Sequence, residues 1–148
     1  MKYLFVAFFS LCFTFSSLAQ DWGHNYVQAK EAATKEHKFI LVNFSGSDWC
    51  GPCIRLHKEV FTTDAFIKLA NEKLVLLNAD FPRYKKNQLP AAQQKINESL
   101  ADQFNTKGIF PLTVLVAVDG KIIKSWDGFP SSIESFNEDL LQTIQDNQ

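Results

Sequence analysis

Apolar residues recur at helical spacing in four parts of the chain. They predict amphipathic helices at residues 22–38, 52–70, 92–104 and 133–144. Thr62-Thr63-Asp64 is expected to interrupt and restart the second helix, and Ser131 or Ser132 to cap the last one. The inward-facing residues of the last two helices are expected to be Ala92, Ile96, Leu100, Phe104, Ile133, Phe136, Leu140, Leu141 and Ile144.

Shorter apolar runs predict strands at residues 39–44, 74–77, 112–118 and 121–126. Asn43 is the one polar residue of the first run, which we therefore expect to be buried on both faces of a partly parallel sheet. Asp119-Gly120 predicts a two-residue hairpin turn between the last two strands, and residues 81–90 a polar loop. The order α-β-α-β-α-β-β-α predicts an α/β fold with a central mixed β-sheet flanked by helices.

The first nineteen residues have the pattern of a secretion signal. A positive start at Met1-Lys2 precedes an apolar run from Leu4 to Phe15, and small residues follow up to Ala19. Cleavage is expected after Ala19, which leaves residues 20–148 as one domain in a periplasmic or secreted protein. The apolar run is short for a membrane span, so an uncleaved N-terminal anchor is the less favoured alternative.

The charge balance argues against a basic binding surface. The whole chain has a formal net charge of −1, and loss of Lys2 with the signal makes the remainder more negative. Nucleic acids and anionic membranes favour basic partners, so neither is expected to bind. The short basic run Arg83–Lys86 is expected to be solvated surface.

Cysteine usage is sparse. Of three cysteines, Cys12 lies in the signal, so the mature chain has Cys50 and Cys53 alone. A disulfide across two intervening residues closes a very small loop and stabilises a fold little, so a purely structural role is disfavoured. Zinc would need two further ligands besides the cysteines, and His57, which lies near in sequence, would supply only one of them. No metal and no cofactor are therefore expected.

The pair lies where a predicted buried strand passes into a helix, within Trp49-Cys50-Gly51-Pro52-Cys53. A helix N-terminus presents free amides and the positive end of the helix dipole, which stabilise a thiolate. Thiolate is the attacking species in disulfide exchange, so Cys50 is the predicted nucleophile. Cys53, one turn later, is placed to attack the resulting mixed disulfide intramolecularly. An inert motif inside a binding or chaperone-like module is the alternative.

Strand, Trp-Cys-Gly-Pro-Cys, helix and a later proline opening the penultimate strand together resemble the thioredoxin superfamily, particularly its exported bacterial thioredoxin-like members. The resemblance implies that Cys50 attacks and Cys53 resolves. It implies that Pro111 is a cis-proline that faces the dithiol and helps to hold an extended substrate segment. From the residues alone, a trans proline opening a strand is the favoured alternative. The remaining substrate-binding residues that it implies are Trp49, Gly51, Pro52 and Phe110.

The chain departs from the thioredoxin pattern near the dithiol. Asn43 stands where thioredoxins have a buried aspartate that assists proton transfer, and Leu76 where a lysine often neighbours it. One extra residue lies between strand and motif, Leu112 follows Pro111 in place of threonine, and the connection at residues 82–94 is longer. These changes concern proton transfer and substrate choice.

Three nearby residues could replace the missing aspartate as proton shuttle or perturb the thiols. Asp48 and Glu59 could act as shuttles, although each is expected to be a solvated carboxylate. His57 could perturb Cys53, although an exposed helical histidine is expected. His24 and His37 are not expected to form a site.

The predicted function is therefore a thiol–disulfide oxidoreductase that reduces disulfides of exported proteins through Cys50 and Cys53. Gly51-Pro52 between the cysteines is associated with reducing members of the superfamily. An exported reductant needs electrons from a membrane-embedded thiol carrier. The alternatives are a disulfide donor or isomerase of the same fold and a non-catalytic thioredoxin-like binding or chaperone module.

Overall fold

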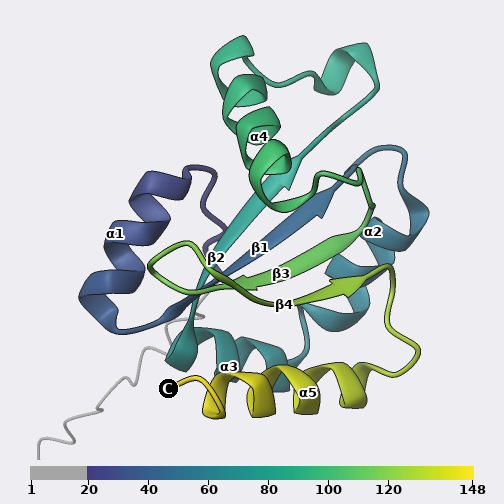
Figure 1. Ribbon diagram of the computed structural model, residues 1–148. Helices are drawn as coiled ribbons and strands as arrows, with labels where there is room; N and C mark the ends of the chain where they lie inside the picture. Colours follow the sequence, from purple (N-terminus) through teal and green to yellow (C-terminus); the bar gives the residue numbers. More distant parts are fainter. Residues whose placement is uncertain (1–19) are drawn as a thin grey trace, which may run out of the picture.

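Five α-helices and four strands make up residues 20–148, the part of the chain that the computed structural model describes (Figure 1). The predicted signal, residues 1–19, lies outside it. In chain order the elements are α1 (Tyr26–Glu36), β1 (Phe39–Ser45), α2 (Gly51–Arg55), the π-helical η1 (Leu56–Val60), α3 (Asp64–Lys73), β2 (Leu74–Asp80), the 3₁₀ turn η2 (Lys85–Asn87), α4 (Ala91–Phe104), β3 (Leu112–Val116), β4 (Ile122–Asp127) and α5 (Ile133–Gln145).

The sheet has the order β2-β1-β3-β4. β1 pairs parallel with β2 and antiparallel with β3, and β3 pairs antiparallel with β4, which confirms the predicted mixed sheet. β1 is central and is buried on both faces, as its continuous apolar run predicted. Gly23 bridges to Leu77 and extends the sheet beyond the outer edge of β2.

Two apolar cores fill the space between the sheet and its helices. Leu41 of β1 packs with residues of η1, α3 and α5 on one face. Ile40, Val42 and Phe44 pack with α1 and α4 on the other face. Because side chains alternate along a strand, Asn43 shares the face of Leu41 and points toward the α2 side of the sheet.

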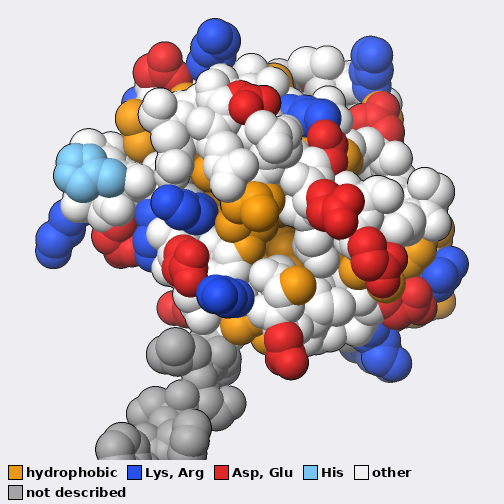
Figure 2. All heavy atoms as spheres, turned by 90° about the horizontal axis from the view of Figure 1, so that it is seen from below, with side chains coloured by type: hydrophobic (Ala, Val, Ile, Leu, Met, Phe, Trp, Pro, Cys, Tyr) orange, Lys and Arg blue, Asp and Glu red, His pale blue; other side chains and the backbone are white. Residues whose placement is uncertain are grey.

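Helices α3 and α5 lie together below the sheet in Figure 1 and face the viewer in Figure 2. Acidic and basic side chains are interspersed there around a small exposed apolar area. None of the helices within residues 20–148 is long and apolar enough to cross a membrane.

Helix starts agree with the predicted caps. Thr63 accepts a hydrogen bond from the amide of Phe66 and begins α3, and Ser132 accepts one from the amide of Ser135 and begins α5. Two inward-facing predictions are wrong. Ala92 is exposed in the first turn of α4, and Leu141 is 39% exposed because Leu140 already fills the core side of α5.

The hairpin between β3 and β4 forms, but the predicted two-residue turn is wrong. The amide of Ala117 donates to the carbonyl of Lys121 at 2.9 Å, so three residues, Val118 to Gly120, make the loop. Gly120 has φ +92°, the left-handed conformation that closes three-residue hairpin loops. An extra residue on β4 then shifts the strand register, β3 ends two residues earlier than predicted, and β4 lies one residue later than predicted.

Candidate active site

The two cysteines lie where β1 passes into α2. Cys50 is the N-cap residue of α2 and Cys53 lies one turn inside it. Their sulfurs form a disulfide, with the Cα atoms 5.2 Å apart. The amide of Cys53 donates to Sγ of Cys50 at 3.2 Å. The predicted pair is thus confirmed as a disulfide, and reduction would leave the Cys50 sulfur beside a helix amide that favours its thiolate.

Trp49, immediately before the dithiol, is held from several sides. Its Nε1 donates to the carbonyl of Phe81 at 2.7 Å, and its ring packs edge-on against Phe110 with centroids 5.5 Å apart. The guanidinium of Arg83 lies 3.5 Å from the centre of the indole. Arg83 is exposed, as the sequence predicted, and it also covers an aromatic face next to the cysteines.

Replacing Gly46 with Ala should destabilise the folded protein. A Cβ at this position would overlap Cε2 of Trp49, whose indole has little freedom to move. Overpacking of this kind costs about 1–3 kcal/mol of unfolding free energy, which denaturant titration measures. Gly51→Ala is the matched control, because nothing lies within 4 Å of a Cβ added there. Equal losses in the two variants would contradict the steric explanation.

Asp48 fastens the segment after β2 to the loop before the dithiol. Its carboxylate accepts hydrogen bonds from the amides of Arg83 at 2.8 Å and Tyr84 at 2.9 Å, and from Nδ2 of Asn87 at 3.0 Å. Partial desolvation acts to raise the pKa of Asp48, but the hydrogen bonds together outweigh it and hold this pKa below its usual range. Asp48 thus lies at the surface, as the sequence predicted, and both of its carboxylate oxygens are also bound to this segment.

Asp48→Ala should release residues 83–87 and speed tryptic cleavage after Arg83, Lys85 and Lys86, which mass mapping would detect. The pKa of Asp48 is lower in the folded than in the unfolded chain, so its stabilisation is present above about pH 4 and is lost as pH falls through the folded pKa. Wild type and variant should therefore converge in stability in acid. Glu31→Ala, at an exposed helical site, is the control, and equal cleavage in both variants would refute the fastening role.

The Phe110–Pro111 peptide bond is cis, as the resemblance implied. Pro111 is buried, and Phe110 lies half-buried against Trp49. Gly51 and Pro52 are exposed at the start of α2. The structure thus brings Trp49 and Phe110 into contact beside the cysteines.

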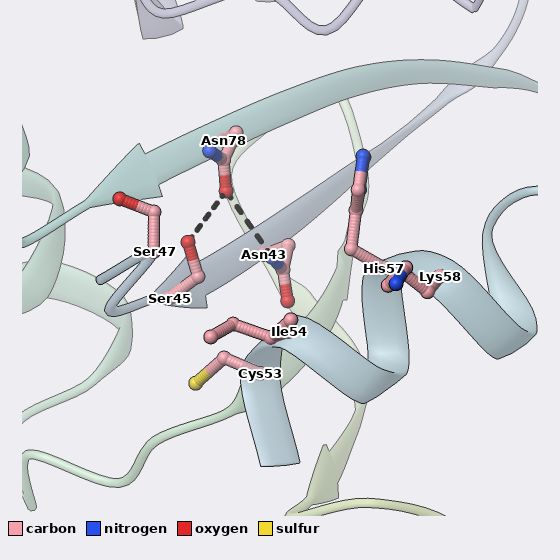
Figure 3. A pocket seen from close by; sticks show the side chains of 8 residues that line it. All are labelled: Asn43, Ser45, Ser47, Cys53, Ile54, His57, Lys58 and Asn78. Atoms are coloured by element: carbon pink, nitrogen blue, oxygen red, sulfur yellow. Dashed lines mark hydrogen bonds between the residues drawn. The ribbon is translucent and has the colours of Figure 1, made fainter. Parts of the chain in front are cut away.

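A polar cluster on β1 and β2 lies next to Cys53, and the sequence prediction missed most of it. Nδ2 of Asn43 donates to Oδ1 of Asn78 at 3.1 Å, and Oγ of Ser45 donates to the same oxygen at 3.2 Å (Figure 3). Oγ of Ser45 also lies 3.3 Å from Oδ1 of Asp80. The sequence does contain one sign of this cluster: Asn78 and Asp80 are two residues apart, which places both side chains on one face of β2.

A cavity of about 240 Å³ lies between this cluster and α2. Its lining consists of Asn43, Ser45, Ser47, Cys53, Ile54, His57, Lys58 and Asn78. Asn43 is 5% exposed, and its Oδ1 is buried with no hydrogen-bond partner among the described residues. In Figure 3 this oxygen points from β1 toward α2.

The other candidates for proton transfer take different positions. Glu59 is exposed and accepts two hydrogen bonds from Arg55, which are the main cause of its lowered pKa. It is the surface carboxylate that the sequence predicted. Leu76, at the position of the thioredoxin lysine, is buried in the apolar core. His57 is exposed as expected, yet its side chain lines the cavity beside Cys53.

Zinc binding was an alternative for the two cysteines. Within residues 20–148, no three His, Cys, Asp or Glu side chains come together to hold a metal ion.

The fold and the dithiol define a class of protein. A Cys-x-x-Cys disulfide at the junction of a central strand and a helix, near a cis-proline, is the arrangement of the thioredoxin-like proteins. The chain belongs to the thioredoxin-like domain family, whose sequence model matches residues 26–144. It is similar to the disulfide bond reductase DsbH of Chlamydia pneumoniae, with 34% identity over 97 residues, and to the thioredoxin-related protein DsbJ of the same organism, with 32% identity over 75 residues.

These similarities differ in extent. The matched region covers 66% of this chain and 57% of DsbH, and 51% of this chain and 22% of DsbJ. The chain thus spans little more than half of one curated relative and less than a quarter of the other. A solved structure of a DsbH oxidoreductase superposes with a TM-score of 0.77 and 25% identity, covering 95% of this chain and 94% of that one.

Proposed function

We propose that this protein is a thiol–disulfide oxidoreductase that reduces disulfides in exported proteins. The observation that carries the proposal is the Cys50–Cys53 disulfide at the start of α2. So short a loop adds little stability, whereas its position beside a helix amide suits thiol exchange. Similarity to a protein named disulfide bond reductase supports the reducing direction, as does Gly51-Pro52 between the cysteines.

In the proposed reaction, the Cys50 thiolate attacks one sulfur of the partner's disulfide. A mixed disulfide forms, and the other partner sulfur leaves as a thiolate. Cys53 then attacks Sγ of Cys50, which re-forms the Cys50–Cys53 bond and releases the partner as a dithiol. The short spacing makes this second step intramolecular. The disulfide form of the chain is the product of the cycle.

We assign substrate contact to the surface around the cysteines. Gly51 and Pro52 are exposed at the start of α2, and Trp49 and Phe110 lie against each other beside it. Pro111, in the cis conformation, would hold an extended segment of the partner next to Cys50.

The reducing direction fits an exported protein only with an electron supply. Residues 1–19 serve as the signal peptide in this proposal, and residues 20–148 act as one thioredoxin-like domain in the periplasm or outside the cell. Such surroundings are oxidising, so a membrane-embedded thiol carrier would return the Cys50–Cys53 pair to its dithiol form. The mildly acidic net charge gives no support for a nucleic-acid partner.

The reduction potential of the Cys50–Cys53 pair tests the direction. We expect a value near that of thioredoxin, about −270 mV, in equilibration against graded thiol/disulfide buffers read out by alkylation and mass spectrometry. A value near or above about −180 mV would make the protein a disulfide donor or isomerase. Full function in the Cys50→Ser/Cys53→Ser double variant would instead show a non-catalytic binding module.

A further inference from the structure

The cavity beside Cys53 has an unusual chemical composition for a proton path. Its eight lining side chains include asparagine, serine and isoleucine, none of which takes up a proton near neutral pH. Lys58 is a cation and has no free acceptor. His57 is the one imidazole of this lining, and a neutral imidazole ring has a free nitrogen that can accept a proton.

Asn43 faces the same space with an unused acceptor. Its Oδ1 is buried and has no partner in the described chain, while its Nδ2 is engaged with Asn78. Leaving a buried acceptor unsatisfied is costly, so a donor in the cavity is favoured, either water or the thiol of reduced Cys53. An amide can accept a hydrogen bond from that donor but cannot keep its proton. The proton must move on to another group.

His57 is placed to be that group. It follows Cys53 by four residues, about one turn, in the continuous helical segment formed by α2 and the π-helical η1. Both line the one cavity, whose volume of about 240 Å³ has room for several water molecules (Figure 3).

We propose that His57 is the base that receives the proton of Cys53 in the resolving step, through water held in this cavity by Asn43. The inference rests on the proposed reductase cycle. The Cys53 S–H bond breaks and its proton passes by way of water to neutral His57. The thiolate forms a bond to Sγ of Cys50, and the bond from Cys50 to the partner breaks. The partner leaves as a thiolate and takes up a proton, returned from His57 or from solvent.

The other charged groups near His57 are less suited than His57 to receive the proton of Cys53. Lys58, on the same segment, lines the cavity and favours the Cys53 thiolate. Glu59 is paired with Arg55. Asp80 is the competing acceptor, because it contacts Ser45. Its carboxylate is already bound by the amide of Ser47 at 2.8 Å and the Ser47 hydroxyl at 2.6 Å.

Stopped-flow reaction of the reduced protein with a symmetric aryl disulfide separates the two steps. The attack of Cys50 releases one coloured thiolate, and the resolving step releases the second. For His57→Gln we expect an unchanged first phase and a second phase slowed on the order of a hundredfold at pH 7. The dependence of the second phase on pH should also change. The control is His37→Asn, on a surface helix end whose left-handed φ of 54° asparagine tolerates.

An unaltered second phase and pH profile in His57→Gln would overturn the inference. So would a slow second phase in Asp80→Asn combined with a normal one in His57→Gln. Failure of the reductase proposal is separate, since it would appear as a reduction potential in the range of disulfide donors or isomerases in the wild-type protein.

Discussion

Cys50→Ser should abolish disulfide reduction, with a loss of more than about a thousandfold, as removal of a nucleophile causes in other enzymes. The reason is local: Cys50 is the N-cap of α2 and its sulfur accepts the Cys53 amide, so the thiolate that helix amides stabilise is at this position. Turnover with a disulfide-containing protein substrate measures the loss. Residual activity within tenfold of wild type would show that another group attacks.

Cys53→Ser should behave differently and accumulate mixed disulfides through Cys50. The attack step remains, but no second thiol releases the partner, so adducts should appear on non-reducing gels and disappear with reductant. The double variant Cys50→Ser/Cys53→Ser is the control and should form none. If Cys53→Ser forms no adduct while Cys50 still reacts with an alkylating agent, the assignment of the two roles is wrong.

Elements with one clear period were predictable from the sequence. The apolar run at residues 39–44 forms most of β1. Apolar and polar residues do not alternate along this run, so the strand is buried on both faces. The hairpin loop was mispredicted because Asp119-Gly120 occurs in turns of more than one length. The length here follows from Gly120 in the left-handed region together with an extra residue on β4.

The cysteine pair could be predicted because its chemistry is contained in five consecutive residues. The polar cluster could not, because it depends on the register of two strands, which pairs Asn43 with Asn78. Asp48 shows the same difficulty. Its partners are 35 to 39 residues away in a segment that no local pattern connects to it.

Asn43→Asp should make the stability of the protein depend on pH. The side chain is 5% exposed, so desolvation would raise the pKa of the new carboxyl above its value in the unfolded chain. A raised acid pKa means that the folded state binds more protons. The unfolding free energy relative to wild type should therefore fall as pH rises from about 4 toward neutral. The fall is about 1.4 kcal/mol for every tenfold difference between the acid dissociation constants of the folded and unfolded chains. A constant difference from wild type across this pH range would show that the carboxyl stays solvated.

The same variant tests how proton transfer is divided between residue 43 of β1 and His57 of η1. A carboxylate at residue 43 can take the proton of Cys53 itself, as an amide cannot, and would make His57 dispensable. Asn43→Asp/His57→Gln should then resolve mixed disulfides much faster than His57→Gln alone, with a pH profile set by the new carboxyl. If the double variant is as slow as His57→Gln, the side chain at residue 43 does not reach the Cys53 proton. In that case the amide of Asn43 serves to hold Asn78, whose Oδ1 also accepts a hydrogen bond from Ser45.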